Sequence, residues 1–123
     1  MVKKVPMKTF GKHLIIELFG SPFKLLNDEA YIRKVILDAA KAAKLTIIDC
    51  VTHKFQPQGV TGVVVVAESH LSIHTWPESS YAAIDVFTCG KGDPYDAYKL
   101  LVRRLKPKNS YVSQIMRGML TKR

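Results

Sequence analysis

No apolar run in this chain of 123 residues approaches the roughly 20 residues that a helix needs to cross a bilayer. The first residues, MVKKVP, are partly basic, but no apolar stretch ending in small residues follows them. A secretory signal is therefore not expected. These absences argue against a membrane partner and predict a cytoplasmic protein.

Cysteine is scarce, with Cys50 and Cys89 alone. Without a secretory context, the simplest interpretation is two reduced and mostly buried thiols. The sequence leaves a disulfide between them open. No Cys-x-x-Cys pair is present, and no metal site is predicted.

Acidic residues are few, 10 against 19 Lys and Arg, so the formal charge is +9. This balance makes nucleic acid a candidate partner. However, the positive charge is spread along the chain, and no basic motif interleaved with aromatic residues is present. The densest cluster lies at the end of an expected helix, where it complements the helix dipole. We therefore expect no nucleic-acid partner, and a non-enzymatic basic nucleic-acid-binding domain is the alternative from a different class.

The apolar pattern predicts one domain over residues 1–123. Strands are expected over residues 13–19, 45–55, 60–68, 70–76, 82–89 and 111–116, with residues 60–68 apolar enough to be buried on both faces. A helix is expected over residues 28–44 with Asn27 as N-cap, and a second one begins at Asp93 and Pro94. Two helices on one face of a largely antiparallel sheet make an α/β (α+β) two-layer sandwich. A second subunit would then cover the other face, so a dimer is expected.

Residues 62–90 concentrate polar and reactive side chains among apolar strands, which is uncommon in a purely structural domain because buried polar groups need partners. Singly, each has a structural explanation: Ser69 as a turn serine, His74 as a satisfied sheet histidine, Cys89 as a small core residue. A Ser/His/Glu hydrolase is also possible, but Ser69 lacks the flanking glycines of a nucleophile elbow. Residue types and spacing leave a catalytic site and a structural explanation equally open. The side chains concerned are Glu68, Ser69, His70, His74, Trp76, Glu78 and Cys89.

A longer motif favours the catalytic site over the structural explanation. The string ESHLSIHTWPE, followed by YAAIDVFTCG, closely resembles the prokaryotic S-adenosylmethionine decarboxylase proenzymes, which are pyruvoyl-dependent and cut themselves. The resemblance extends to GKHLIIELFG, to HKFQPQGVTGVVVV and to the helix that begins at DP. It covers nearly the whole chain.

The resemblance implies a cut between Glu68 and Ser69, which gives a β chain of residues 1–68 and an α chain of residues 69–123. The Ser69 hydroxyl would attack the Glu68 carbonyl, and elimination and hydrolysis would leave a pyruvoyl group in place of Ser69. His74 would be the proton acceptor in this processing, as a neutral imidazole can be. Thr61 stands where the family commonly has a serine that assists processing.

The resemblance also implies how the substrate is handled. The pyruvoyl ketone would form a Schiff base with the α-amine of S-adenosylmethionine and accept the electrons left by CO2. Cys89 would be the proton donor. Phe55 and Trp76 match the aromatic residues that stack on adenine, and Glu78 matches the carboxylate that holds the ribose.

The assembly implied by the family is a dimer of cleaved protomers with an αββα four-layer arrangement. The product, decarboxylated S-adenosylmethionine, would donate aminopropyl groups for spermidine synthesis. A pyruvoyl-dependent arginine decarboxylase on the same scaffold is the closest alternative, because a carboxylate such as Glu78 could also bind a guanidinium.

Overall fold

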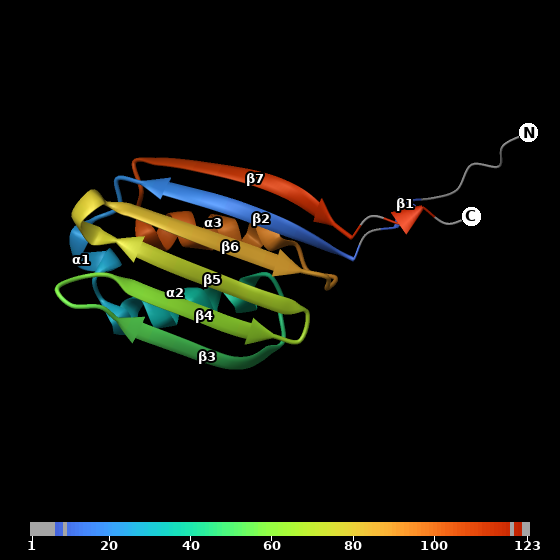
Figure 1. Cartoon of the computed structure of the whole chain (residues 1–123), viewed down its shortest axis with the longest axis horizontal. Helices are drawn as coiled ribbons and strands as arrows, with labels where there is room; N and C mark the ends of the chain where they lie inside the picture. Colours follow the sequence, from blue (N-terminus) through green and yellow to red (C-terminus); the bar gives the residue numbers. More distant parts are fainter. Residues whose placement is uncertain (1–6, 9, 119, 122–123) are drawn as a thin grey trace, which may run out of the picture.

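A six-stranded sheet is the frame of the molecule. The computed structural model describes residues 7–8, 10–118 and 120–121. Neighbouring strands of the large sheet are antiparallel, in the order β3-β4-β5-β6-β2-β7 (Figure 1). The strands are β2 (Gly11–Phe19), β3 (Ile47–Lys54), β4 (Val60–Val66), β5 (Ser69–Trp76), β6 (Tyr81–Thr88) and β7 (Asn109–Arg117).

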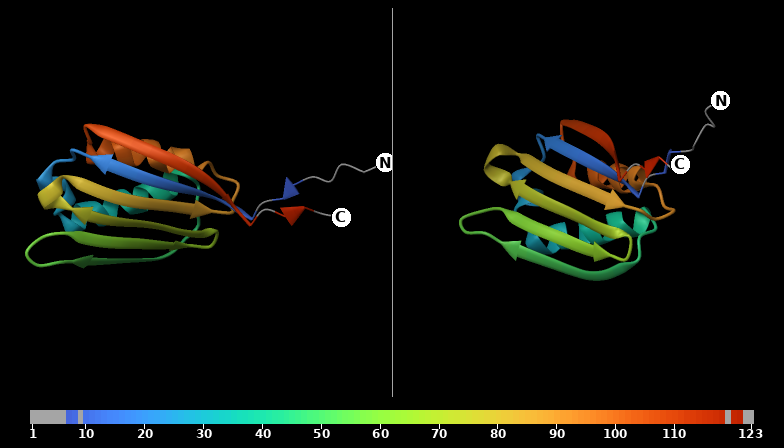
Figure 2. Two further views of the ribbon diagram at one scale, coloured as in Figure 1. Left: turned by 45° about the horizontal axis from the view of Figure 1, so that its top comes forward. Right: turned by 45° about the vertical axis from the view of Figure 1, so that its right-hand side comes forward.

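The two long helices, α2 (Glu29–Ala42) and α3 (Pro94–Leu105), lie together on one face of this sheet (Figures 1 and 2). The short helix α1 (Phe23–Leu26) precedes α2. Their apolar faces and the facing side chains of the sheet form the core, which drives folding because it is removed from water. The predicted two-layer α+β sandwich is therefore confirmed. The largest core side chains are Leu14, Ile16, Leu18, Leu26, Ile32, Ile36, Leu71, Ile73, Ile84, Leu101 and Leu105.

The other face of the sheet is uncovered. Alternation along β5 buries Leu71, Ile73 and Thr75 under the helices and leaves the residues between them on the uncovered face. The prediction that residues 60–68 are buried on both faces is wrong for the single chain, because Val65 is 40% exposed. Helices cover only one side of β4, so in the part of the chain that the structure describes nothing packs over its second row of valines.

The start of α2 differs from the prediction. Its N-cap is Asp28, whose carboxylate accepts a hydrogen bond from the Tyr31 backbone N–H, and not Asn27. Asn27 instead ends α1, and its side-chain oxygen accepts a hydrogen bond from the Gly59 N–H. The predicted start of α3 is confirmed, with Asp93 as N-cap and a proline in its first turn.

Two further pieces were not predicted. The two-residue strands β1 (Met7–Lys8) and β8 (Leu120–Thr121) pair as a small ribbon that extends beyond β2 and β7 (Figure 2). A 3₁₀ turn, η1 (Pro77–Ser79), connects β5 to β6. Among the helices of the described residues, none has the length and apolar character to cross a membrane.

Candidate active site

A tight turn joins β4 to β5. Val66 pairs with Ser69, so only Ala67 and Glu68 lie in the turn between them. Ser69 has a φ of 153°, in a region that residues with side chains rarely adopt. Such a conformation costs on the order of 1–3 kcal/mol and persists only where the surroundings impose it. The backbone is therefore strained at Ser69, directly after the peptide bond between Glu68 and Ser69.

Thr46 holds this turn from the side. Its backbone oxygen accepts a hydrogen bond from the Ala67 N–H at 2.9 Å. Its own N–H and hydroxyl donate to the two carboxylate oxygens of Glu68, at 3.0 and 3.1 Å. The backbone hydrogen bond from Thr46 is the main reason that the pKa of the Glu68 carboxyl lies below its usual value. No sequence pattern identified Thr46, because one threonine in a loop has no distinguishing spacing.

Cys89 approaches the turn from the end of β6. Its N–H and its thiol both lie 3.1 Å from the carbonyl oxygen of Glu68, and both are placed to donate to it. Two donors on one carbonyl oxygen form the arrangement that stabilises negative charge during acyl transfer. Cys89 is exposed, so the expectation of a mostly buried thiol is wrong for this residue, whereas Cys50 is buried; both are free cysteines. β6 ends at Thr88, which leaves Cys89 at the edge of the sheet.

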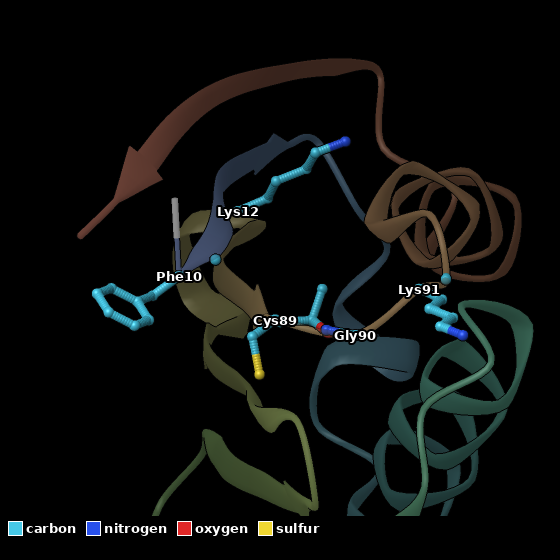
Figure 3. Close-up of a pocket in the computed structure, with 8 residues that line it drawn as sticks. Phe10, Lys12, Cys89, Gly90 and Lys91 are labelled. Atoms are coloured by element: carbon cyan, nitrogen blue, oxygen red, sulfur yellow. The ribbon is translucent and has the colours of Figure 1, made fainter. Parts of the chain in front are cut away.

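A small pocket of about 160 Å³ opens beside Cys89 (Figure 3). The side chains of Lys12 and Lys91 point away from Cys89 in this view. The pocket is too small for a nucleoside and has room for a few water molecules. Its walls are Phe10, Gly11, Lys12, Thr88, Cys89, Gly90, Lys91 and Gly92.

A second cluster lies at the other end of β4 and β5. The Thr61 hydroxyl and His74 Nδ1 are hydrogen-bonded at 2.9 Å across these strands. Trp76, 43% exposed, stacks on Tyr81 with ring centroids 5.2 Å apart. A cavity of about 350 Å³ opens here, within the usual size range of ligand sites. It is lined by Phe55, Gln58, Gly59, Thr61, His74, Thr75, Trp76 and Glu78.

The structure thus separates the predicted site residues into two groups. Ser69 lies with Glu68 and Cys89 at one end of β5, and His74 lies at the other end with the cavity. Five residue steps along an extended strand separate Ser69 from His74, a distance of about 16 Å. Within a single chain His74 does not reach Ser69, which the sequence did not reveal.

A charged network crosses the uncovered face between the two groups. His13 Nε2 lies 2.9 Å from an Asp85 carboxylate oxygen, and Arg117 lies 3.2 Å from His13 Nδ1. The Tyr81 hydroxyl donates to Glu17, and burial, followed by this hydrogen bond, raises the pKa of Tyr81 to about 12. Asp85, Glu17 and Arg117 each have a hydrogen-bond partner within the chain, which charged groups need where a face is covered. In the described part of the chain, no group of three or more His, Cys, Asp or Glu is placed to hold a metal ion.

The comparison with known families gives the class of the protein. The model of the S-adenosylmethionine decarboxylase family matches residues 12–118, a span that contains both groups of site residues. With the two-layer fold, this match defines the chain as an enzyme, a decarboxylase. A non-enzymatic nucleic-acid-binding domain does not fit this result.

Individual relatives agree along nearly the whole chain. The S-adenosylmethionine decarboxylase proenzyme of Methanococcus maripaludis (strain C5) is 51% identical over 115 residues, which cover 93% of this chain and 94% of the relative. That of Prochlorococcus marinus (strain MIT 9313) is 52% identical over 108 residues, 87% of this chain and 86% of the relative. The chain belongs to the S-adenosylmethionine decarboxylase family, which confirms the predicted resemblance. These names give no support to the arginine decarboxylase alternative.

A solved structure gives the same result for the fold. The crystal structure of the adenosylmethionine decarboxylase from Aquifex aeolicus VF5 matches with a TM-score of 0.86 and 39% sequence identity. The match covers 92% of this chain and 94% of that one. The arrangement of helices and strands is therefore shared with a protein described as a decarboxylase.

Proposed function

We propose that this chain is the precursor of a pyruvoyl-dependent S-adenosylmethionine decarboxylase, which cuts itself between Glu68 and Ser69 into residues 1–68 and 69–123. The observation that carries the proposal is the pair of 3.1 Å contacts from the Cys89 N–H and thiol to the Glu68 carbonyl oxygen. A carbonyl held by two donors, next to a serine hydroxyl, is suited to attack by that hydroxyl.

In the first step of processing, the Ser69 hydroxyl oxygen attacks the Glu68 carbonyl carbon through a five-membered ring. Negative charge develops on the carbonyl oxygen, where the two donors of Cys89 stabilise it. The C–N bond then breaks and an ester replaces the peptide bond. The strained φ of 153° at Ser69 favours this step because breaking the bond releases the constraint. The hydrogen bonds from Thr46 keep the turn in place meanwhile.

In the second step, His74 of a second copy of the chain removes the α-proton of residue 69, and the Glu68 carboxylate leaves. Water then displaces ammonia and leaves a pyruvoyl group at the start of the second chain. The pocket of about 160 Å³ beside Cys89 offers space for that water. The hydrogen bond with Thr61 at 2.9 Å fixes the orientation of the His74 ring.

In decarboxylation, a pyruvoyl group supplies a ketone that binds the substrate's amine and, with the adjacent amide, accepts the electron pair left by CO2. The residues at this end of β5 fit such a group, because it is made from Ser69 itself and lies beside a thiol. The Cys89 sulfur lies beside the turn that holds residue 69, 3.1 Å from the Glu68 carbonyl oxygen, and a thiol there can act as the acid that gives a proton to the substrate carbon.

The cavity near Trp76 is the proposed binding site for the adenosyl part of the substrate. The rings of Phe55 and Trp76, both nearly half exposed, offer faces on which adenine can stack. The Glu78 carboxylate can accept hydrogen bonds from the ribose hydroxyls. A sulfonium cation also gains electrostatically from an aromatic face. Recognition and chemistry then require groups from both ends of β5.

A second copy of the chain completes the site in this proposal. Two uncovered sheet faces pack against each other around a two-fold axis, so that the cavity end of one chain meets the Ser69 end of the other. His74 of the partner subunit then removes the α-proton of residue 69, which His74 of the same chain does not reach. The result is an (αβ)₂ dimer with αββα layers. Exposed apolar side chains available on this face are Val51, Val65, Trp76, Tyr111 and Ile115. The cytoplasmic location stays a prediction.

Intact mass spectrometry of the purified protein, under denaturing and reducing conditions, tests the cut. We expect two chains that separate after Glu68, the second lighter by one ammonia than a peptide starting with serine. One full-length mass after long incubation at neutral pH would contradict self-cleavage. Release of CO2 from S-adenosylmethionine and not from arginine, measured on the same sample, then identifies the substrate.

A further inference from the structure

One residue of the motif has no role in the mechanism above, although it lies next to the reacting hydroxyl. His70 Nδ1 is 3.4 Å from the Ser69 hydroxyl oxygen. His74, the proposed base of the second step, lies about 16 Å along the strand, and its Nδ1 is hydrogen-bonded to Thr61. Within one chain, His70 is therefore the histidine in contact with Ser69.

The His70 ring is held by its neighbours on the uncovered face. It pairs across the strands with Val65 on one side and Phe87 on the other. Its ring meets the Phe87 ring edge-on, with centroids 5.8 Å apart and an interplanar angle of 75°. Phe87 in turn contacts the His13 ring, with centroids 5.4 Å apart, and the Arg117 guanidinium, 5.3 Å from the Phe87 centroid. These contacts restrict the ring while Nδ1 stays near the hydroxyl.

We propose that His70 is the base that accepts the Ser69 hydroxyl proton in the first step of self-cleavage. The proposal rests on the proposed function, because it assigns a residue to that reaction. The hydroxyl proton moves to His70 Nδ1 as the oxygen bonds to the Glu68 carbonyl carbon. The carbon–nitrogen bond then breaks, and the proton passes from His70 to the Ser69 nitrogen. The step is an isomerisation that consumes no water and no co-reactant.

This assignment divides the two histidines between two steps. With His70 as base and Cys89 as donor to the carbonyl oxygen, one chain holds every group needed to form the ester. The ester's elimination instead needs a base at the α-carbon, which is the role proposed for His74 of the partner subunit. Ester formation and elimination therefore depend on different histidines and can be blocked separately.

Hydroxylamine separates these steps experimentally, because it cuts an ester at neutral pH and leaves an amide intact. We would follow wild type, His70→Ala, His70→Asn and His74→Ala by intact mass spectrometry, with and without hydroxylamine. The asparagine variant keeps a hydrogen-bonding group near Nδ1 but no base. Lys41→Ala, which removes an exposed side chain of α2 in the helical layer, is the control for the processing rate. Circular dichroism shows which variants fold.

We expect both His70 variants to stay intact with hydroxylamine and to process at least about 100-fold more slowly, the usual effect of losing a general base. Added imidazole should partly restore cleavage of the folded His70→Ala protein, which it would not do for a purely structural residue. His74→Ala should be cut by hydroxylamine after Glu68.

Four results would overturn the proposal. One is processing of the folded His70→Asn protein at the wild-type rate. Another is a hydroxylamine-sensitive His70 variant, because the ester would then form without this base. The third is a wild-type chain that itself stays intact, which would overturn the proposed function and this assignment with it. Slow processing of His70→Ala without imidazole rescue would also count against a base, since it would indicate a structural role.

Discussion

The two ends of β5 hold different halves of a reaction. At the Ser69 end, hydrogen bonds from Thr46 and Cys89 fix a strained turn, and the pocket of about 160 Å³ beside Cys89 is too small for a nucleoside. At the Trp76 end, a cavity of about 350 Å³ is lined by aromatic rings and a carboxylate, and neither Ser69 nor Cys89 is among its lining residues. One strand therefore separates bond-making groups from recognition groups, and neither end is a complete active site.

Ser69→Ala gives the largest expected effect on this comparison, because it removes the nucleophile and the source of the pyruvoyl group. We expect a folded, full-length chain with no detectable decarboxylation, measured by intact mass and by CO2 release. Ser113→Ala, at an exposed position of β7, is the matched control and should be cut normally. Normal cleavage of Ser69→Ala would place the cut elsewhere.

Cys89→Ala should affect both reactions at the Ser69 end. Processing loses one of two donors to the Glu68 carbonyl oxygen, which costs about 100- to 1,000-fold in rate at comparable sites. In the fraction that is cleaved, kcat should fall while KM stays close to wild type, because the residue does not line the larger cavity. Steady-state kinetics with a titration of active chains checks this. Unchanged turnover would remove its role as proton donor.

Glu78→Gln tests the Trp76 end alone. Losing a charge-assisted hydrogen bond, about 1.5–3 kcal/mol, should raise KM for S-adenosylmethionine by roughly 10- to 100-fold. Processing should keep its wild-type rate, because the substrate is not needed for the cut. Isothermal titration with a non-reactive substrate analogue measures the same loss directly. A variant that binds normally but processes slowly would reverse the roles of the two ends.

The smallest expected effect is on stability at the Ser69 end, and it depends on pH. Hydrogen bonds from Thr46 lower the pKa of Glu68 in the folded chain below its ordinary value of 4.5. The stabilisation is therefore fully present above about pH 4.5 and is lost as the pH falls through the lower folded value. Adding Glu68→Gln to the uncleaved Ser69→Ala chain should lower the melting temperature slightly at pH 7, and this difference should shrink as the pH is lowered from 4.5 toward 3. An equal difference at both pH values would contradict this role for Thr46.

Much of the fold followed from local sequence patterns. Alternation predicted β5, and Asp93 followed by proline predicted α3, because side-chain periodicity and capping act over a few residues. Other features depend on contacts between distant segments. Asn27 has the composition of an N-cap, yet its side chain is engaged by Gly59, 32 positions away in the sequence. The exposure of Val65 likewise depends on which face the helices cover.

The candidate site was predictable as a set of residues but not as a geometry. The motif named Ser69, His74 and Cys89, because the family resemblance depends on residue identity. It did not show that Cys89 donates to the Glu68 carbonyl, since β6 pairs beside β5 only in the folded sheet. It did not identify Thr46, because Thr46 and Glu68 are 22 positions apart in the sequence and meet only in the folded chain. The separation of Ser69 from His74 became evident only when both were placed on one extended strand.

Complementation between two inactive chains tests most directly whether the two ends of β5 work together across a dimer. Ser69→Ala and His74→Ala chains would be co-expressed with different tags, purified through both tags and analysed by intact mass spectrometry. A mixed dimer has one site with an intact Ser69 and an intact His74, so we predict cleavage of the His74→Ala chain there and none when it is expressed alone. A His74→Ala chain that stays whole in verified mixed dimers would contradict a site shared between subunits.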